Sequence, residues 1–161
     1  MSIAALLADA RAALSEVPRE ALGELRESRR VLGIARSARI VRVGDAWHLG
    51  VLLLGIDKLF ATGDVIRARR EAPRGYTAES QRARAELAAA ARRGGFAEGE
   101  TVHIGWRMLD PDAISRGAAS DPLALTDGVP SVRWSAVGGY VPLDAYLRER
   151  VELLAHPPAG A

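Results

Sequence analysis

The segment from residue 31 to residue 70 constrains the fold most, because it alternates short apolar runs with residues that favour turns. Gly44-Asp45, the tetrapeptide GIDK at residues 55–58 and Gly63-Asp64 separate these runs. Glycine and aspartate between short apolar runs are typical of β-hairpins. The segment therefore predicts an antiparallel β-meander over residues 31–70.

The three turns fix an expected pairing between neighbouring strands. A two-residue turn at Gly44-Asp45 places Arg42 opposite Trp47. The turn through GIDK places Leu54 opposite Leu59, and the third turn brings the chain back in the same way. Because side chains alternate between the two faces of a sheet, each pairing decides which of the following side chains share a face.

Alternation along these strands divides the side chains between two faces. One face is the expected core and includes His48, which we interpret as a buried structural histidine. The opposite face is apolar in its middle and basic toward its ends. Its polar and aromatic members include Arg42, Trp47, Arg67 and Arg69.

Apolar residues recur at helical spacing outside the meander. Pro18 divides the first such region into two short helices, and Thr77 is the expected N-cap of a later one. We predict one α+β domain over residues 1–161, an antiparallel meander sheet with N-terminal, central and C-terminal helices packed on it. The expected elements are a helical segment over 1–28, the meander over 31–70, a helix over 77–93, further strands over 100–136 and a helix over 142–154.

Composition narrows the possible chemistry. The chain has no cysteine, which excludes disulfides, thiolate metal sites and cysteine nucleophiles. No apolar run approaches the roughly 20 residues of a membrane-spanning helix, and the amphipathic N-terminus does not resemble a signal peptide. We therefore expect a cytoplasmic protein that does not associate with a membrane.

Hydrolytic and metal motifs are absent from the sequence. The residue three positions before Lys58, the single lysine, is Gly55, so there is no Ser-x-x-Lys dyad. The histidines lack metal-ligand spacing, and we expect neither a metal nor another cofactor. A hydrolase built on this chain would have to draw on His103, expected on the polar face of a strand, on Asp110 or Asp112 beyond the end of that strand, or on a serine at a strand end.

Arginine is concentrated in one part of the chain. Residues 65–93 carry eight Arg against three Glu, although the formal net charge of the whole chain is only +2. We predict that Arg42, Trp47, Arg67 and Arg69 bind an anionic small molecule or an anionic protein partner. The alternative is a solvated arginine edge that protects the sheet from aggregation.

Other partner classes follow from the same reading. No helix-turn-helix, zinc-finger or RNP1-like sequence is present, so the chain is not expected to bind nucleic acid. A shallow patch of this kind also suits pairing across a two-fold axis, which makes a homodimer an alternative.

Four stretches resemble a family of small, largely uncharacterised actinobacterial proteins of about this length. They are GDAWHLGVLLL, LFATGDVIRA, ARRGGFAEGETV and VPLDAYLRERVELLAHPP, and the likeness extends from about residue 20 to the end. Some members of that family carry the label glutaminase, so the resemblance implies amide hydrolysis as a possible activity. The sequence itself predicts a non-catalytic binding or interaction module, with a glutaminase-type amide hydrolase as the alternative.

Overall fold

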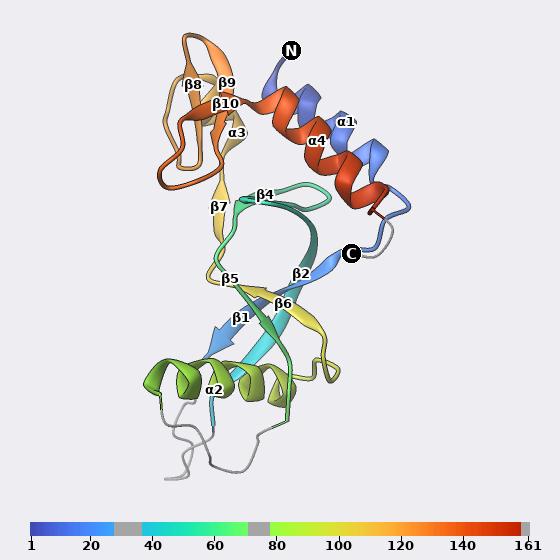
Figure 1. Ribbon diagram of the computed structural model, residues 1–161, viewed down its shortest axis with the longest axis vertical. Coiled ribbons are helices and arrows are strands. Elements are labelled where there is room, and N and C mark those ends of the chain that lie inside the picture. The colour runs from blue at the N-terminus through green and yellow to red at the C-terminus, as the bar shows by residue number, and fades with distance from the viewer. Residues whose placement is uncertain (28–36, 71–77, 159–161) are drawn as a thin grey trace. The chain divides into compact units, whose positions relative to one another are not determined.

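The computed structural model describes residues 1–27, 37–70 and 78–158 (Figure 1). These residues form four helices and ten strands, which confirms the predicted α+β class. They divide into two compact units. Unit 1 comprises residues 1–19, 46–62 and 107–161, and unit 2 comprises residues 20–45 and 63–106.

Unit 2 is a mixed sheet with one helix. The strands lie in the order β5-β6-β1-β2, and β1 and β6 are parallel whereas β5 and β6 are antiparallel. A small core forms around the buried side chains of Ile40, Phe96 and Val102. The elements are β1 (Glu20–Arg26), β2 (Arg39–Leu49), β5 (Asp64–Arg67), α2 (Glu79–Arg93) and β6 (Thr101–Ile104).

Helix α2 confirms the prediction for residues 77–93 within one turn, and it packs against β5 (Figure 1). Its buried face consists of Ala89, Ala90 and Ala91, and these small side chains permit a close approach. Gly94 follows, and a Cβ atom at this position would lie 1.5 Å from the carbonyl oxygen of Ile40. The backbones are therefore too close for any residue but glycine. Thr77, the predicted N-cap, lies outside the described residues.

Strand β1 corrects the prediction of a second helix after Pro18. Ala21 and Leu22 fit either a short helix or a buried strand, because a short apolar run does not distinguish the two. The chain forms a strand because it lies between β6 and β2 and hydrogen-bonds to both. Gly23 allows this packing, since a Cβ atom there would lie 2.6 Å from Ile40 Cγ2.

The first sheet of unit 1 begins with the last part of β2, residues 46–49, so this strand contributes to both units. From there the hydrogen-bonded order continues through β3 (Leu52–Leu54), β4 (Leu59–Ala61) and β7 (Arg107–Leu109), all antiparallel. The turn through GIDK pairs Leu54 with Leu59, as predicted.

The other two predicted turns are wrong. Gly44-Asp45 lies inside the continuous strand β2, and the hairpin turn falls at Gly50-Val51, where Gly50 has a φ of +67°. Glycine in the left-handed region supplies the backbone conformation that a two-residue turn requires. After Gly63 the chain does not return along β4, because β5 pairs with β6 instead.

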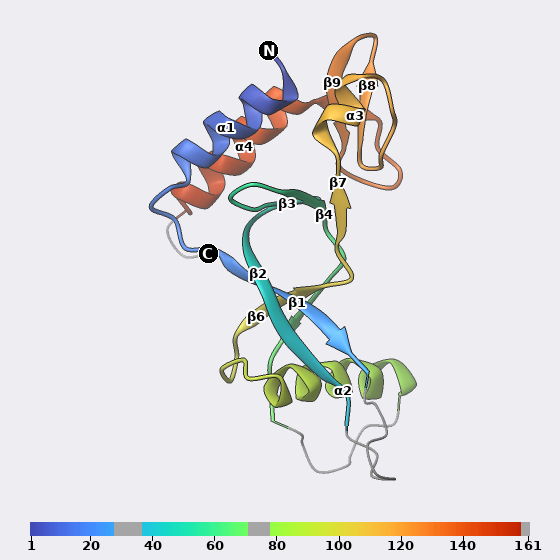
Figure 2. The same cartoon turned by 180° about the vertical axis from the view of Figure 1, so that it is seen from behind.

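A second, three-stranded sheet in unit 1 has the order β10-β9-β8. The hairpin turns at Asp127 and Gly128, both of which have positive φ. Helices pack beside this sheet, and α1 and α4 lie side by side (Figures 1 and 2). The elements are α1 (Ile3–Ala13), α3 (Pro111–Ser115), β8 (Leu123–Thr126), β9 (Val129–Arg133), β10 (Tyr140–Pro142) and α4 (Leu143–Ala155).

The core of unit 1 is larger and joins the ends of the chain. Ile3, Leu7 and Leu14 from α1 and the residue after it pack with Leu143 and Leu147 from α4. Helix α1 is also tied to the β3–β4 turn. Arg11 Nε donates to the carbonyl oxygen of Gly55 at 2.8 Å, and burial lowers the pKa of Arg11 while nearby Asp57 opposes that shift. None of the helices in the described residues is both long and apolar enough to cross a membrane.

Candidate functional site

Unit 1 carries a groove of about 470 Å³ between α1 and α4, closed at one side by the start of β9. Its lining combines apolar side chains with charged ones, and we call the charged set the rim. The apolar lining includes Leu6, Ala10, Ala13, Val129, Pro130, Leu147 and Val151. The charged side chains of the lining are Asp9, Asp144, Arg148 and Glu152, and Met1, which carries the N-terminal amino group, also lines the groove.

Helix periodicity explains why these side chains share the groove. On α1, Leu6, Ala10 and Ala13 are four and three residues apart and therefore lie on one face. Leu6 is only half-buried, next to the fully buried stripe that packs into the core. On α4, Leu147 and Val151 are four residues apart in the same way. Ala10 and Leu147 belong to the core of unit 1, and Leu6 and Val151 pack against it. Each helix thus has an apolar flank at the edge of its core-facing stripe, and the two flanks form the groove.

The charged rim is acidic overall. Asp144, Arg148 and Glu152 follow one another at intervals of four residues on α4. Arg148 Nη2 lies 3.6 Å from Asp144 Oδ2, and Glu152 Oε1 lies 3.2 Å from the Nδ1 atom of His156. Asp9 on α1 forms no ion pair with any residue in the described parts of the chain. Three carboxylates therefore border the groove, against one guanidinium and the N-terminal amino group of Met1.

The structure does not bring the predicted arginine and aromatic surface together. Arg42 and Trp47 do not face each other across a hairpin, because both lie on β2 and belong to different units. The Arg42 guanidinium pairs with Asp45 at 2.6 Å and with Glu100, and it stacks on Phe96 with its Cζ atom 5.2 Å from the ring centroid. These contacts give Arg42 a structural role in unit 2.

Trp47 is a core residue of unit 1, with 5% of its surface exposed. Its Nε1 atom donates to the carbonyl oxygen of Val17 at 2.8 Å, and Arg19 lies over its ring at 5.3 Å. Arg67 and Arg69 of unit 2 are exposed. Anion binding by these two arginines stays a prediction.

The two histidines of interest exchange the environments that the sequence predicted. His103 is fully buried, whereas His48 is half-buried with its Nε2 atom 2.9 Å from the carbonyl oxygen of Gly50. The expected polar face for His103 was wrong because Val102, His103 and Ile104 of β6 are all buried, so both faces of this strand are covered.

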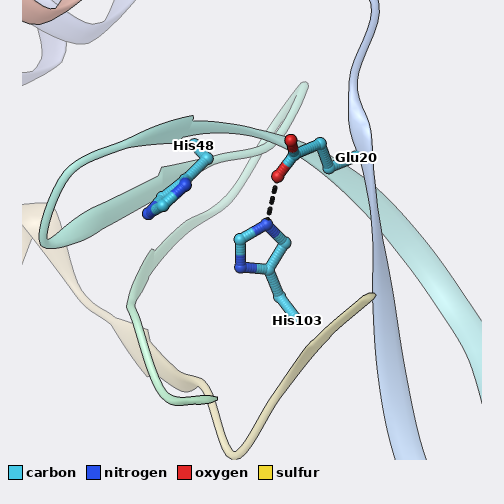
Figure 3. A group of neighbouring side chains, drawn as sticks. All are labelled: Glu20, His48 and His103. Carbon is cyan, nitrogen blue, oxygen red and sulfur yellow. Dashed lines mark hydrogen bonds and ion pairs between the residues drawn. The ribbon is translucent and has the colours of Figure 1, made fainter. Parts of the chain in front are cut away.

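His103 contacts a carboxylate that the sequence did not indicate. Its Nε2 atom lies 2.5 Å from Glu20 Oε2 at the start of β1, the neighbouring parallel strand (Figure 3). The Glu20 side chain is 41% exposed, so the pair connects a buried imidazole to a partly solvated acid. Glu20 was missed because residues 18–25 were expected to be helical.

Asp110 and Asp112 have structural positions in unit 1. Asp110 is the N-cap of the short helix α3, and its Oδ1 atom accepts hydrogen bonds at 3.0 Å from the backbone N–H groups of Asp112 and Ala113. Asp112 is exposed in the first turn of that helix. Capping satisfies N–H groups that have no partner within the helix. A catalytic role for His103, Asp110 or Asp112 stays a prediction.

Sequence reasoning also missed the groove residues. Leu6 and Val151 belong to the apolar stripes that helical spacing predicts for the two terminal helices, but such a stripe does not show which of its residues stay half-buried and line a groove. Comparison of the chain with protein-family models, with curated proteins and with solved structures finds no match.

Proposed function

We propose that the protein is a non-catalytic binding module that accepts an amphipathic helix of a partner protein in the groove between α1 and α4. The observation that carries this proposal is the groove itself, with apolar walls from two adjacent helices and charged residues along its rim. Amphipathic helices commonly bind in apolar grooves through side chains spaced three or four residues apart. A cytoplasmic location belongs to the same proposal.

The extent of the lining supports a helix rather than a compact small molecule. Lining residues run from Leu6 to Ala13 on α1 and from Asp144 to Glu152 on α4. At a rise of 1.5 Å per residue, these helical stretches are about 10 Å and about 12 Å long. About two turns of a bound helix span that length and would place two or three apolar side chains in the groove.

Binding of a neutral amphipathic peptide tests the proposal. The probe is a fluorescein-labelled 18-residue helix with leucine at positions i, i+3, i+4 and i+7 and glutamine elsewhere, and fluorescence anisotropy measures its Kd. Ala13 is exposed and lines the groove, so Ala13→Trp should fill the groove and weaken binding at least about tenfold.

Ala12→Trp is the matched control, because Ala12 is also exposed on α1 but does not line the groove. The two variants carry the same added side chain one residue apart. Equal binding of the peptide to both variants, or no binding to the wild-type protein, would refute the proposed function. A change of the protein from monomer to dimer at the concentrations used would point instead to a second copy as the occupant.

Amide hydrolysis is the second candidate, and the contact between His103 and Glu20 is the observation that favours it. A histidine oriented by a carboxylate is one part of many acyl-transfer sites. Ammonia release from glutamine by the purified protein measures this activity. Turnover that His103→Gln abolishes would support it, and absence of turnover would remove it.

A further inference from the structure

We infer that the helix accepted by the groove is basic, with lysine or arginine on both sides of its apolar stripe. This inference rests on the proposed function and adds the charge of the partner. It follows from the distribution of carboxylates around the groove, which differs from the charge of the rest of the chain.

The acidic residues lie on both walls. Asp9 belongs to α1, whereas Asp144 and Glu152 belong to α4. A helix lying between the two walls would therefore have a carboxylate near each of its flanks. Cationic side chains at those flanking positions would meet opposite charge, and acidic side chains would meet like charge.

The cationic groups of the lining do not reverse this sign. Arg148 is close enough to Asp144 to form an ion pair with it, and the remaining carboxylates, Asp9 and Glu152, still outnumber the N-terminal amino group of Met1. His156, the neighbour of Glu152, does not line the groove.

The charge of the whole chain predicts the opposite preference. Its formal net charge is +2 at pH 7, so non-specific attraction would favour an acidic peptide. A preference for a basic peptide would therefore have to come from the local rim. This opposition in sign makes the inference easy to test.

The experiment compares three labelled peptides that differ only in their polar residues: leucine with lysine, leucine with glutamate, and leucine with glutamine. Anisotropy titrations at 50 and at 300 mM NaCl measure each Kd. At the lower salt concentration we expect the lysine peptide to bind about tenfold more tightly than the glutamate peptide, as a few exposed charge pairs would give. The difference should shrink at the higher concentration because salt screens exposed charges.

Charge-neutralising variants assign the preference to the rim. The double variant Asp9→Asn/Glu152→Gln should reduce the difference between the lysine and glutamate peptides to less than about threefold. The control is Glu16→Gln/Glu149→Gln, which changes the net charge equally at exposed positions of unit 1 that do not line the groove. The control should retain the tenfold difference.

The possible outcomes separate this inference from the proposed function. Equal binding of all three peptides, weakened in each case by Ala13→Trp, would leave the groove as a helix-binding site and overturn the inference about charge. A preference for the glutamate peptide would also overturn it. Failure of all three peptides to bind would refute the proposed function and the inference together.

Discussion

The hydroxyl group of Tyr146 binds the backbone on both sides of Gly50. It donates to the carbonyl oxygen of Leu49 at 2.8 Å and accepts from the N–H group of Val51 at 2.9 Å. Helix α4 thus holds the β2–β3 turn, although Tyr146 follows Gly50 by almost a hundred residues. The stability of unit 1 should depend on this single oxygen atom.

Tyr146→Phe removes the hydroxyl and retains the ring, so Leu49 and Val51 lose one hydrogen bond each. We expect the free energy of unfolding to fall by about 1–3 kcal/mol, the usual cost of leaving buried polar groups without a partner. Urea denaturation followed by circular dichroism measures the change. Tyr140→Phe is the control because Tyr140 is 41% exposed, and equal stability of the two variants would contradict the prediction.

Gly50→Ala should be destabilising for two reasons that a second substitution can separate. A Cβ atom at Gly50 would lie 2.2 Å from the Tyr146 hydroxyl oxygen, and the φ of +67° is unfavourable for alanine. In a Tyr146→Phe background the collision with the hydroxyl oxygen is removed. The unfavourable φ of alanine remains and costs about 1–3 kcal/mol. A double-mutant cycle should therefore show that the two substitutions together cost less than the sum of their separate effects. Strict additivity would show that the hydroxyl does not restrict this turn.

Gly94→Ala tests close backbone packing where the φ angle is ordinary. Gly94 has a φ of −80°, so alanine could adopt its conformation, but a Cβ atom would collide with the carbonyl oxygen of Ile40. We expect the free energy of unfolding to fall by about 3 kcal/mol or more, because the backbone must move to accommodate the added Cβ atom. Gly44→Ala is the matched control, since its nearest contact is a side-chain atom 3.7 Å away. Similar melting temperatures for the two variants would show that α2 can shift without cost.

Glu20→Gln removes the charge beside buried His103 and keeps a side chain of the same shape. We expect the free energy of unfolding to fall by about 1–3 kcal/mol, the usual effect of weakening a hydrogen bond to a buried group. Glu24→Gln is the control on the same strand, because Glu24 pairs with Arg26 at the surface, where such a pair contributes at most about 1 kcal/mol. The prediction fails if denaturation gives the same free energy of unfolding for both variants.

The terminal and central helices were predictable because their signals are long. Helices α1, α2 and α4 each extend over three or more turns, and the buried residues of α1 and α4 recur at helical spacing. The β3–β4 hairpin was also predictable, because the glycine and aspartate of the turn lie directly between the two apolar runs that pair. Local patterns of this kind do not require knowledge of the distant chain.

Strands β1 and β2 could not be predicted in the same way. The apolar run of β1 is only a few residues long, and its strand conformation depends on β6, which lies about eighty residues later in the chain. Gly44-Asp45 is chemically suited to a turn, but β2 continues through it. Tertiary pairing therefore outweighed local preference in both places.

The candidate site was hidden for a related reason. The apolar flanks of α1 and α4 can be recognised separately, but the groove exists only because helices from opposite ends of the chain become neighbours. The arginines were conspicuous in the sequence, yet Arg42 is occupied by its contacts with Asp45, Glu100 and Phe96. Abundance of a residue type did not indicate where the site lies.

The division of the chain between its two units has a consequence for biosynthesis. Unit 2 is complete in sequence once Trp106 has been made, whereas unit 1 needs both α1 and α4 to close its core. During vectorial synthesis on the ribosome, α1 therefore emerges before α4 and must wait for it before it can bury its apolar stripe. Contacts of such high sequence separation form slowly. The groove should consequently form only after α4 has left the ribosome, later than the core of unit 2.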